Sequence, residues 1–123
     1  MARASELEII RGDDYDDSFA VLGEDDDPVE NAEALAIFFT AREFPSGGVD
    51  GDVVLELEMG DGIALADAAD ATFDVVFSAD KTVSVAPGTY LYDYQCVEAG
   101  GRVTTVEVGQ LIVTRDATRR TAV

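Results

Sequence analysis

Hydrophobic and polar residues alternate with a period of two along most of the chain, and turn-forming residues interrupt this alternation about every ten residues. Successive side chains of a β-strand point to opposite faces of the sheet, so this alternation predicts half-buried strands. Short strands at such spacing are typical of a β-sandwich or barrel. The pattern therefore predicts an all-β fold, which we expect to be an antiparallel β-sandwich of about seven strands.

The individual strands are expected where the alternation is cleanest. They lie at residues 7–10, 19–22, 35–42, 53–58 and 73–77, with a shorter piece around residue 83 and a final pair within residues 89–114. The final pair is joined through "EAGG", which has the length and glycine content of a β-hairpin loop. The segment "IALADAADA" fits either a short strand or a helical turn.

The first strand of this hairpin, "TYLYDYQCV", carries three tyrosines at alternate positions. Tyr90, Tyr92, Tyr94 and Cys96 share one face, and polar residues such as Asp93 occupy the other. A solvated strand face is polar, so we expect the tyrosine face to be buried. The alternative is an exposed aromatic strip that binds a ligand. The same reasoning places further apolar residues in the core, namely Leu55, Leu57, Phe73 and Phe77.

Two local features refine this hairpin. "PGTY" comes just before the penultimate strand and predicts a tyrosine corner, in which the Tyr90 hydroxyl bonds back to the upstream backbone. The last strand changes phase at Gly109, since Val106 and Leu111 have opposite parity. Such a shift predicts a β-bulge at Gly109.

Length and charge limit the number of domains and the kinds of partner that the chain can have. The 123 residues suit one domain spanning 1–123, with short arms at residues 1–5 and 115–123. The 26 acidic and 8 basic residues give a net charge of −18, which argues against a nucleic-acid or anionic-membrane partner. No apolar run reaches the roughly 20 residues that cross a bilayer, and the N-terminus lacks a signal-peptide pattern, so we expect synthesis in the cytoplasm.

The kind of charge adds a further expectation about the source. There is one lysine against seven arginines, and the acidic residues are spread over most loops rather than gathered in one tail. This usage is found in proteins from salty or GC-rich sources. A high-salt, halophilic source is one interpretation, because salt would screen the self-repulsion. The other is that acidity serves solubility.

The residues for several common kinds of catalysis are missing. Carboxylate pairs, which glycosidases use, are so abundant among the 26 acidic residues that they mark no particular site. The chain has no histidine, which removes a Ser-His-Asp triad and a Cys-His pair, and its single cysteine excludes an intrachain disulfide and a cysteine-based zinc cluster. No phosphate-binding or dinucleotide fingerprint is present. We therefore expect no enzyme, no catalytic residue and no cofactor.

Acidic loops raise the separate question of metal binding. "GDDYDD" and "GEDDDP" supply the carboxylate oxygens that calcium prefers, but neither has the glycine position of an EF-hand loop. We expect solvated charge and no metal site, with weak divalent binding as the alternative. The tripeptide "RGD" at residues 11–13 is expected to mark the end of the first strand and not an integrin motif.

The order of landmarks resembles a family of phage proteins. "RGDDY", "PGTY" with its alternating strand, and "GGRVTTVEVGQLIV" followed by "RDAT" are similar to the N-terminal domain of phage baseplate upper proteins and related immunoglobulin-like virion proteins of tailed viruses, over about residues 6–118. The resemblance implies an immunoglobulin-like β-sandwich that assembles into a virion. The longer baseplate proteins continue past such a domain, whereas this chain stops at Val123, so we expect a stand-alone virion component, which is a tail, baseplate, fibre-attachment or head decoration protein. The alternative is a cellular immunoglobulin-like module, which would bind carbohydrate.

The basic residues near the C-terminus suggest how such a protein assembles. "TRDATRRTAV" contains Arg115, Arg119 and Arg120, three of the 8 basic residues in the chain. A basic arm on an acidic body is suited to contact the acidic surface of a neighbouring copy. We expect other virion proteins as partners, in multiple copies of a symmetric assembly. The alternative is a solubilising tail that folds back on its own domain.

Overall fold

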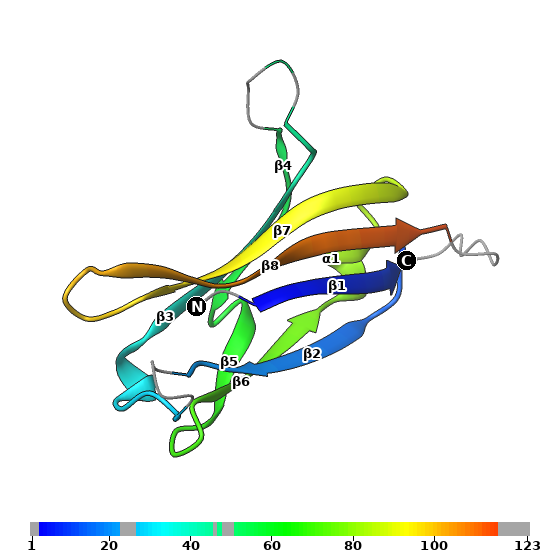
Figure 1. Cartoon of the computed structure of the whole chain (residues 1–123). Helices are drawn as coiled ribbons and strands as arrows, with labels where there is room; N and C mark the ends of the chain where they lie inside the picture. The colour runs from blue at the N-terminus through cyan, green and yellow to red at the C-terminus, as the bar shows by residue number, and fades with distance from the viewer. Residues whose placement is uncertain (1–2, 23–26, 46, 48–50, 116–123) are drawn as a thin grey trace.

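Eight strands form one continuous sheet that curls nearly into a barrel (Figure 1). The computed structural model describes residues 3–22, 27–45, 47 and 51–115. The strand order is β1-β8-β7-β3-β4-β5-β6-β2, so β1 and β2 are the two edges of the sheet. The strands are β1 (Arg3–Ile10), β2 (Tyr15–Ala20), β3 (Ala36–Arg42), β4 (Val53–Met59), β5 (Gly62–Asp67), β6 (Thr72–Phe77), β7 (Gly88–Val97) and β8 (Val103–Thr114).

The expected all-β class is confirmed, but a seven-stranded immunoglobulin-like sandwich is not. The described residues form eight strands in one sheet, and β1 pairs in parallel with β8. The ambiguous segment after β4 forms β5, which pairs in parallel with β4 only at Glu58–Gly62 and Met59–Ile63. Gly62 has a φ of 99°, a conformation that glycine adopts without steric cost. This short link continues the sheet where a sandwich would divide into two.

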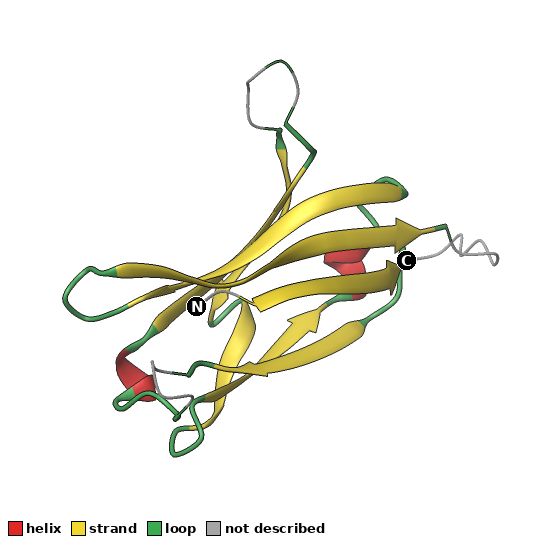
Figure 2. Ribbon diagram, viewed as in Figure 1, coloured by secondary structure: helices red, strands yellow, loops and turns green. Residues whose placement is uncertain are grey.

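Several strand boundaries also differ from those expected. β1 begins at Arg3, so residues 3–5 of the expected N-terminal arm belong to a strand, and β2 covers Tyr15–Ala20 rather than residues 19–22. The expected strand around residue 83 is wrong, because the chain there follows a helical turn, α1 (Ala79–Thr82). Figure 2 shows that helix in the described part of the chain is limited to α1 and a second short segment, η1 (Ala32–Ala34).

Hydrogen bonds to α1 hold the connection between β1 and β2, the two edge strands. Thr82 is fully buried, and its hydroxyl accepts a hydrogen bond from the Gly12 amide at 3.1 Å and donates one to the Asp13 carbonyl at 2.8 Å. The Ala79 amide donates to the Asp14 carboxylate at 2.6 Å. The "RGD" segment is therefore held by its backbone as part of the connection between β1 and β2.

The interior of the curled sheet is the hydrophobic core, and its centre is aromatic. The predicted core residues Leu55, Leu57, Phe73, Phe77 and the three tyrosines of β7 are all buried, which confirms the tyrosine face as core and not as an exposed binding strip. Phe39 lies among them, with ring centroids 5.0 Å from Phe77, 5.3 Å from Tyr92 and 5.0 Å from Tyr94. Each such contact stabilises by about 0.5–1.5 kcal/mol beyond the area that it buries.

Candidate functional site

Two tyrosine hydroxyls of β7 lie inside the core, and each is bonded to a carboxyl group. The Tyr92 hydroxyl donates to Glu107 of β8 at 2.6 Å, and both side chains are 1% exposed. The Tyr94 hydroxyl donates to Asp17 of β2 at 3.0 Å. A buried polar group is costly unless it is hydrogen-bonded. The two pairs therefore connect β7 to its neighbour β8 and to the edge strand β2.

Glu107 faces the core because of a bulge that lies three residues before the predicted one. Tyr94 pairs with Glu107 and Gln95 with Thr105, so Val106 is the extra residue of β8. Gly109 pairs regularly with Tyr92, and the expected bulge at Gly109 is wrong. The bulge puts Glu107 on the inner face with Leu111, and leaves Val108 outside. At this point of β8 an acidic residue faces the core and the apolar Val108 faces outward, contrary to the usual pattern.

The phenol of Tyr94 is held in its neutral form. Burial is the largest cause that raises the pKa of Tyr94 well above its ordinary value, and the nearby Asp17 carboxylate raises it further. A neutral phenol donates a hydrogen bond to a carboxylate, as the geometry requires. Tyr94 is therefore suited to fix strands together and not to release its proton near neutral pH.

The third tyrosine of β7 bonds to the backbone. The Tyr90 hydroxyl donates to the carbonyl of Ala86 at 2.5 Å, four residues upstream, while the ring is largely buried. This contact runs in the direction that a tyrosine corner requires. Burial, and secondarily Glu43, raises the pKa of the Tyr90 phenol, so the donor keeps its proton.

Cys96 has the setting of a structural cysteine. Its side chain is buried on the inner face of β7. Burial raises the pKa of the thiol, and Glu98 raises it further. Because the thiolate is the reactive form, this environment opposes nucleophilic or metal-binding chemistry at Cys96.

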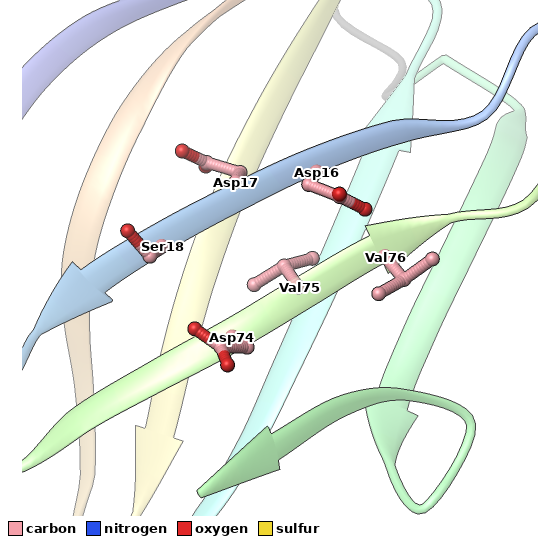
Figure 3. Close-up of a pocket in the computed structure, with 6 residues that line it drawn as sticks. All are labelled: Asp16, Asp17, Ser18, Asp74, Val75 and Val76. Carbon is pink, nitrogen blue, oxygen red and sulfur yellow. The ribbon is translucent and has the colours of Figure 1, made fainter. Parts of the chain in front are cut away.

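A shallow acidic pocket of about 440 Å³ lies over β2 and β6 (Figure 3). The two strands are antiparallel, with Asp16 opposite Val76 and Ser18 opposite Asp74. Figure 3 shows that the lining residues come from these two strands alone, namely Asp16, Asp17, Ser18, Asp74, Val75 and Val76. Within the described ranges no group of three or more ligating side chains is placed to hold a metal ion. The pocket supplies negative charge but no arranged donor set.

The structure places only one residue of the predicted docking arm. Arg115 follows β8 directly and is exposed. Arg119 and Arg120 lie outside the described residues, as does part of the second acidic loop at residues 23–26. The docking role of the arm stays a prediction. Among the described residues there is no helix with the length and apolar character needed to cross a membrane.

Asp17 and Glu107 were not identified from the sequence, although a signal for both exists. Asp17 has the parity of Phe19, which is buried on β2. Glu107 has the parity of Leu111 and Val113 when β8 is counted back from its end. Such a buried pair is indicated by an acidic residue at an inward position of one strand and a tyrosine at an inward position of another.

Comparison with known proteins gives information about the fold. No family model matches the chain, and no curated protein matches it. Among solved structures, the N-terminal domain of phage TP901-1 ORF48 is similar, with a TM-score of 0.51 and 16% sequence identity over 89% of this chain and 85% of that chain. At this identity the similarity concerns the fold. The resemblance to an N-terminal domain of a phage protein is thereby confirmed at the level of structure.

Proposed function

We propose that the chain is a structural component of a tailed-virus particle that acts through protein–protein assembly and not through catalysis. The observation that carries this proposal is the fold shared with the N-terminal domain of phage TP901-1 ORF48 over most of both chains. Fold alone does not determine function. The proposal therefore also depends on what the described side chains do.

Those side chains support a scaffold. The tyrosine and carboxyl groups inside the sheet are bonded to each other, and the thiol of Cys96 is buried. A reactive centre needs groups that are accessible and poised to exchange protons or attack a substrate. The shallow pocket over β2 and β6 is lined by carboxylates, a serine and two valines, with no histidine or cysteine. The exposed side chains of Asp16, Ser18 and Asp74 fit a solvated surface better than an enclosed reaction site.

The expected partners are other virion proteins of the tail, baseplate or head, each contacted by several copies of this chain. The net charge of −18 favours partners with basic surfaces and disfavours nucleic acid. A basic arm that begins at Arg115 and includes Arg119 and Arg120 would reach an acidic neighbour, where arginine–carboxylate pairs fix orientation. The edge strands β1 and β2 offer backbone groups to an extended segment of a partner.

Deleting residues 115–123 tests the assembly mechanism. The shortened chain should keep the thermal unfolding midpoint of the full chain, because β8 ends at Thr114. Its occupancy in purified particles should fall, since the arginine contacts are lost. If it folds normally and enters particles at full occupancy, the docking role of the arm is wrong. A neighbourhood of capsid, portal or tail genes would separate a virion protein from a cellular binding module.

A further inference from the structure

The outer side of β3, β7 and β8 differs in composition from the rest of this acidic chain. β7 lies between the other two, and the three are long neighbouring strands in Figure 1. From Leu91 to Val97 the outward positions of β7 pair with outward positions of β3 and of β8. Within this part of the described sheet, Asp93 and Arg42 are the charged residues, and the others are apolar or neutral polar. We call these paired outward side chains the β3–β7–β8 face.

Large apolar side chains on this face are open to solvent. Phe38 on β3 is 38% exposed, and Leu91 on β7 is 39% exposed. On β8, Val108 is 38% and Val103 is 56% exposed. They occur on all three strands and surround Asp93, which pairs with Val108 on one side and with Thr40 on the other. A single exposed apolar residue needs no explanation, but several on adjacent strands form a patch.

Acidic side chains flank this face on both sides. Next to β8, the edge strand β1 carries exposed Glu6 opposite Gln110 and exposed Glu8 opposite Ile112. Next to β3, the strand β4 carries exposed Glu56 opposite Thr40 and Glu58 opposite Phe38. The outward positions therefore change from acidic to nearly uncharged and back to acidic across five consecutive strands.

This distribution has the organisation of a protein interface. The centre of an interface is depleted of charge and enriched in large apolar groups, and its rim is polar and solvated. The chain has 26 acidic residues in 123, whereas Asp93 is the single acidic residue among the paired outward positions of this face. Asp93 is half-buried at the centre, where it can accept a hydrogen bond from a partner.

We propose that the β3–β7–β8 face binds another protein of the particle, one whose contact surface is apolar at its centre and lined with arginine or lysine at its edge. The partner's basic groups would meet the glutamates of β1 and β4, which is the charge complementarity that orients an interface. A second copy of this chain fits less well. An isologous contact would place the same acidic rims against each other, between two bodies of charge −18. The choice of a particle protein rests on the proposed function.

A lysine placed on this face tests the proposal. Leu91→Lys and Phe38→Lys each put a positive charge at an apolar position of this face, opposite the apolar centre of the partner, and should lower occupancy in purified particles by about tenfold or more. Val76→Lys is the matched control, since Val76 is 45% exposed on the outer side of β6, away from this face. All three variants should unfold near the wild-type temperature, because each replaced side chain is exposed.

The outcomes separate this inference from the proposed function. If Leu91→Lys and Phe38→Lys enter particles as well as Val76→Lys, the face is not the docking surface, while the virion role stands. If all three lysine variants lose occupancy equally, the loss is not specific to the face and the inference is again wrong. If the wild-type chain is itself missing from particles, the proposed function is wrong and this inference is overturned with it.

A photo-reactive residue identifies the occupant. Benzoylphenylalanine at position 38 replaces an aromatic side chain on the face, and irradiation of purified particles should link the chain to a different virion protein. The same group at position 76 should give no such product. A cross-linked dimer of this chain, together with a dimer in about 1 M sodium chloride that Leu91→Lys dissociates, would show that the occupant is a second copy and would overturn the proposed partner.

Discussion

The Tyr92 hydroxyl donates a hydrogen bond to the Glu107 carboxyl group at 2.6 Å, in a part of the core where each side chain is 1% exposed. The contact joins the central strand β7 to β8 beside the bulge at Val106. It explains why a glutamate rather than a valine occupies the inner face of β8 at this point, since the inward phenol needs an acceptor.

Removing the donor of this pair should weaken the fold. Tyr92→Phe is expected to lower the free energy of unfolding by about 1–2 kcal/mol, because a buried hydrogen bond is lost. Tyr15→Phe is the control, since the Tyr15 ring packs against Phe77 and its hydroxyl makes no hydrogen bond within the described residues. A double-mutant cycle with Glu107→Gln in urea should give a coupling of about 0.5 kcal/mol or more. Strict additivity would mean that the carboxyl group is no better an acceptor for Tyr92 than the amide of glutamine.

The backward bond of Tyr90 gives a second stability prediction. Tyr90→Phe should cost about 1 kcal/mol, because the substitution removes the donor to the Ala86 carbonyl and keeps the ring. Chemical denaturation with an unchanged m-value would measure this loss. A change near zero would show that the contact does not act as a tyrosine corner.

Alkaline pH should destabilise the protein through its tyrosines. The folded state raises the pKa of Tyr94 above the ordinary value of 10.0, chiefly by burial, and those of Tyr15 and Tyr90 are raised as well. Above about pH 10 the unfolded chain therefore loses protons that the folded chain keeps, and the free energy of unfolding falls as pH rises. Below pH 10 the stability that these protonated tyrosines contribute to the folded state is fully present.

Tyr94→Phe isolates the largest part of that effect. The variant should lose stability less steeply than the wild type between about pH 10 and 12 in equilibrium unfolding. Absorbance at 295 nm should show one tyrosine fewer that resists ionisation in the folded state. An identical pH dependence in both proteins would contradict the assignment of the shift to Tyr94.

Salt should stabilise the fold. The charge of −18 on a folded surface repels itself more strongly than on an extended chain, and about 1 M sodium chloride shortens the screening length to about 3 Å. The thermal midpoint is expected to rise markedly between dilute buffer and molar sodium chloride. A flat response would remove the high-salt interpretation and leave solubility as the reason for the acidity.

Local alternation was sufficient to predict much of the fold. The tyrosines of β7 and the leucines of β4 point inward as their parity indicates, because a strand with one polar and one apolar face can be buried in only one way. The hairpin of β7 and β8 was also predictable, since its loop and both strands are contiguous in sequence.

The long-range features were not predictable from the same patterns. The parallel pairing of β1 with β8 and the short link between β4 and β5 join segments whose alternation is equally compatible with two separate sheets. At β8, local hydrophobicity favoured Val106 and Val108 as inward residues, yet the bulge turned Glu107 inward to meet Tyr92. The need for an acceptor at position 107 becomes clear only when β8 is considered together with its partner strand β7.

The central claim is that this chain assembles into a virus particle, and quantitative mass spectrometry of purified particles tests it most directly. The account predicts that the chain co-purifies with the particles through density-gradient sedimentation, at several copies per particle and in a fixed ratio to a tail, baseplate or head protein. Absence of the chain from particles that are produced by cells in which it is expressed would contradict the account.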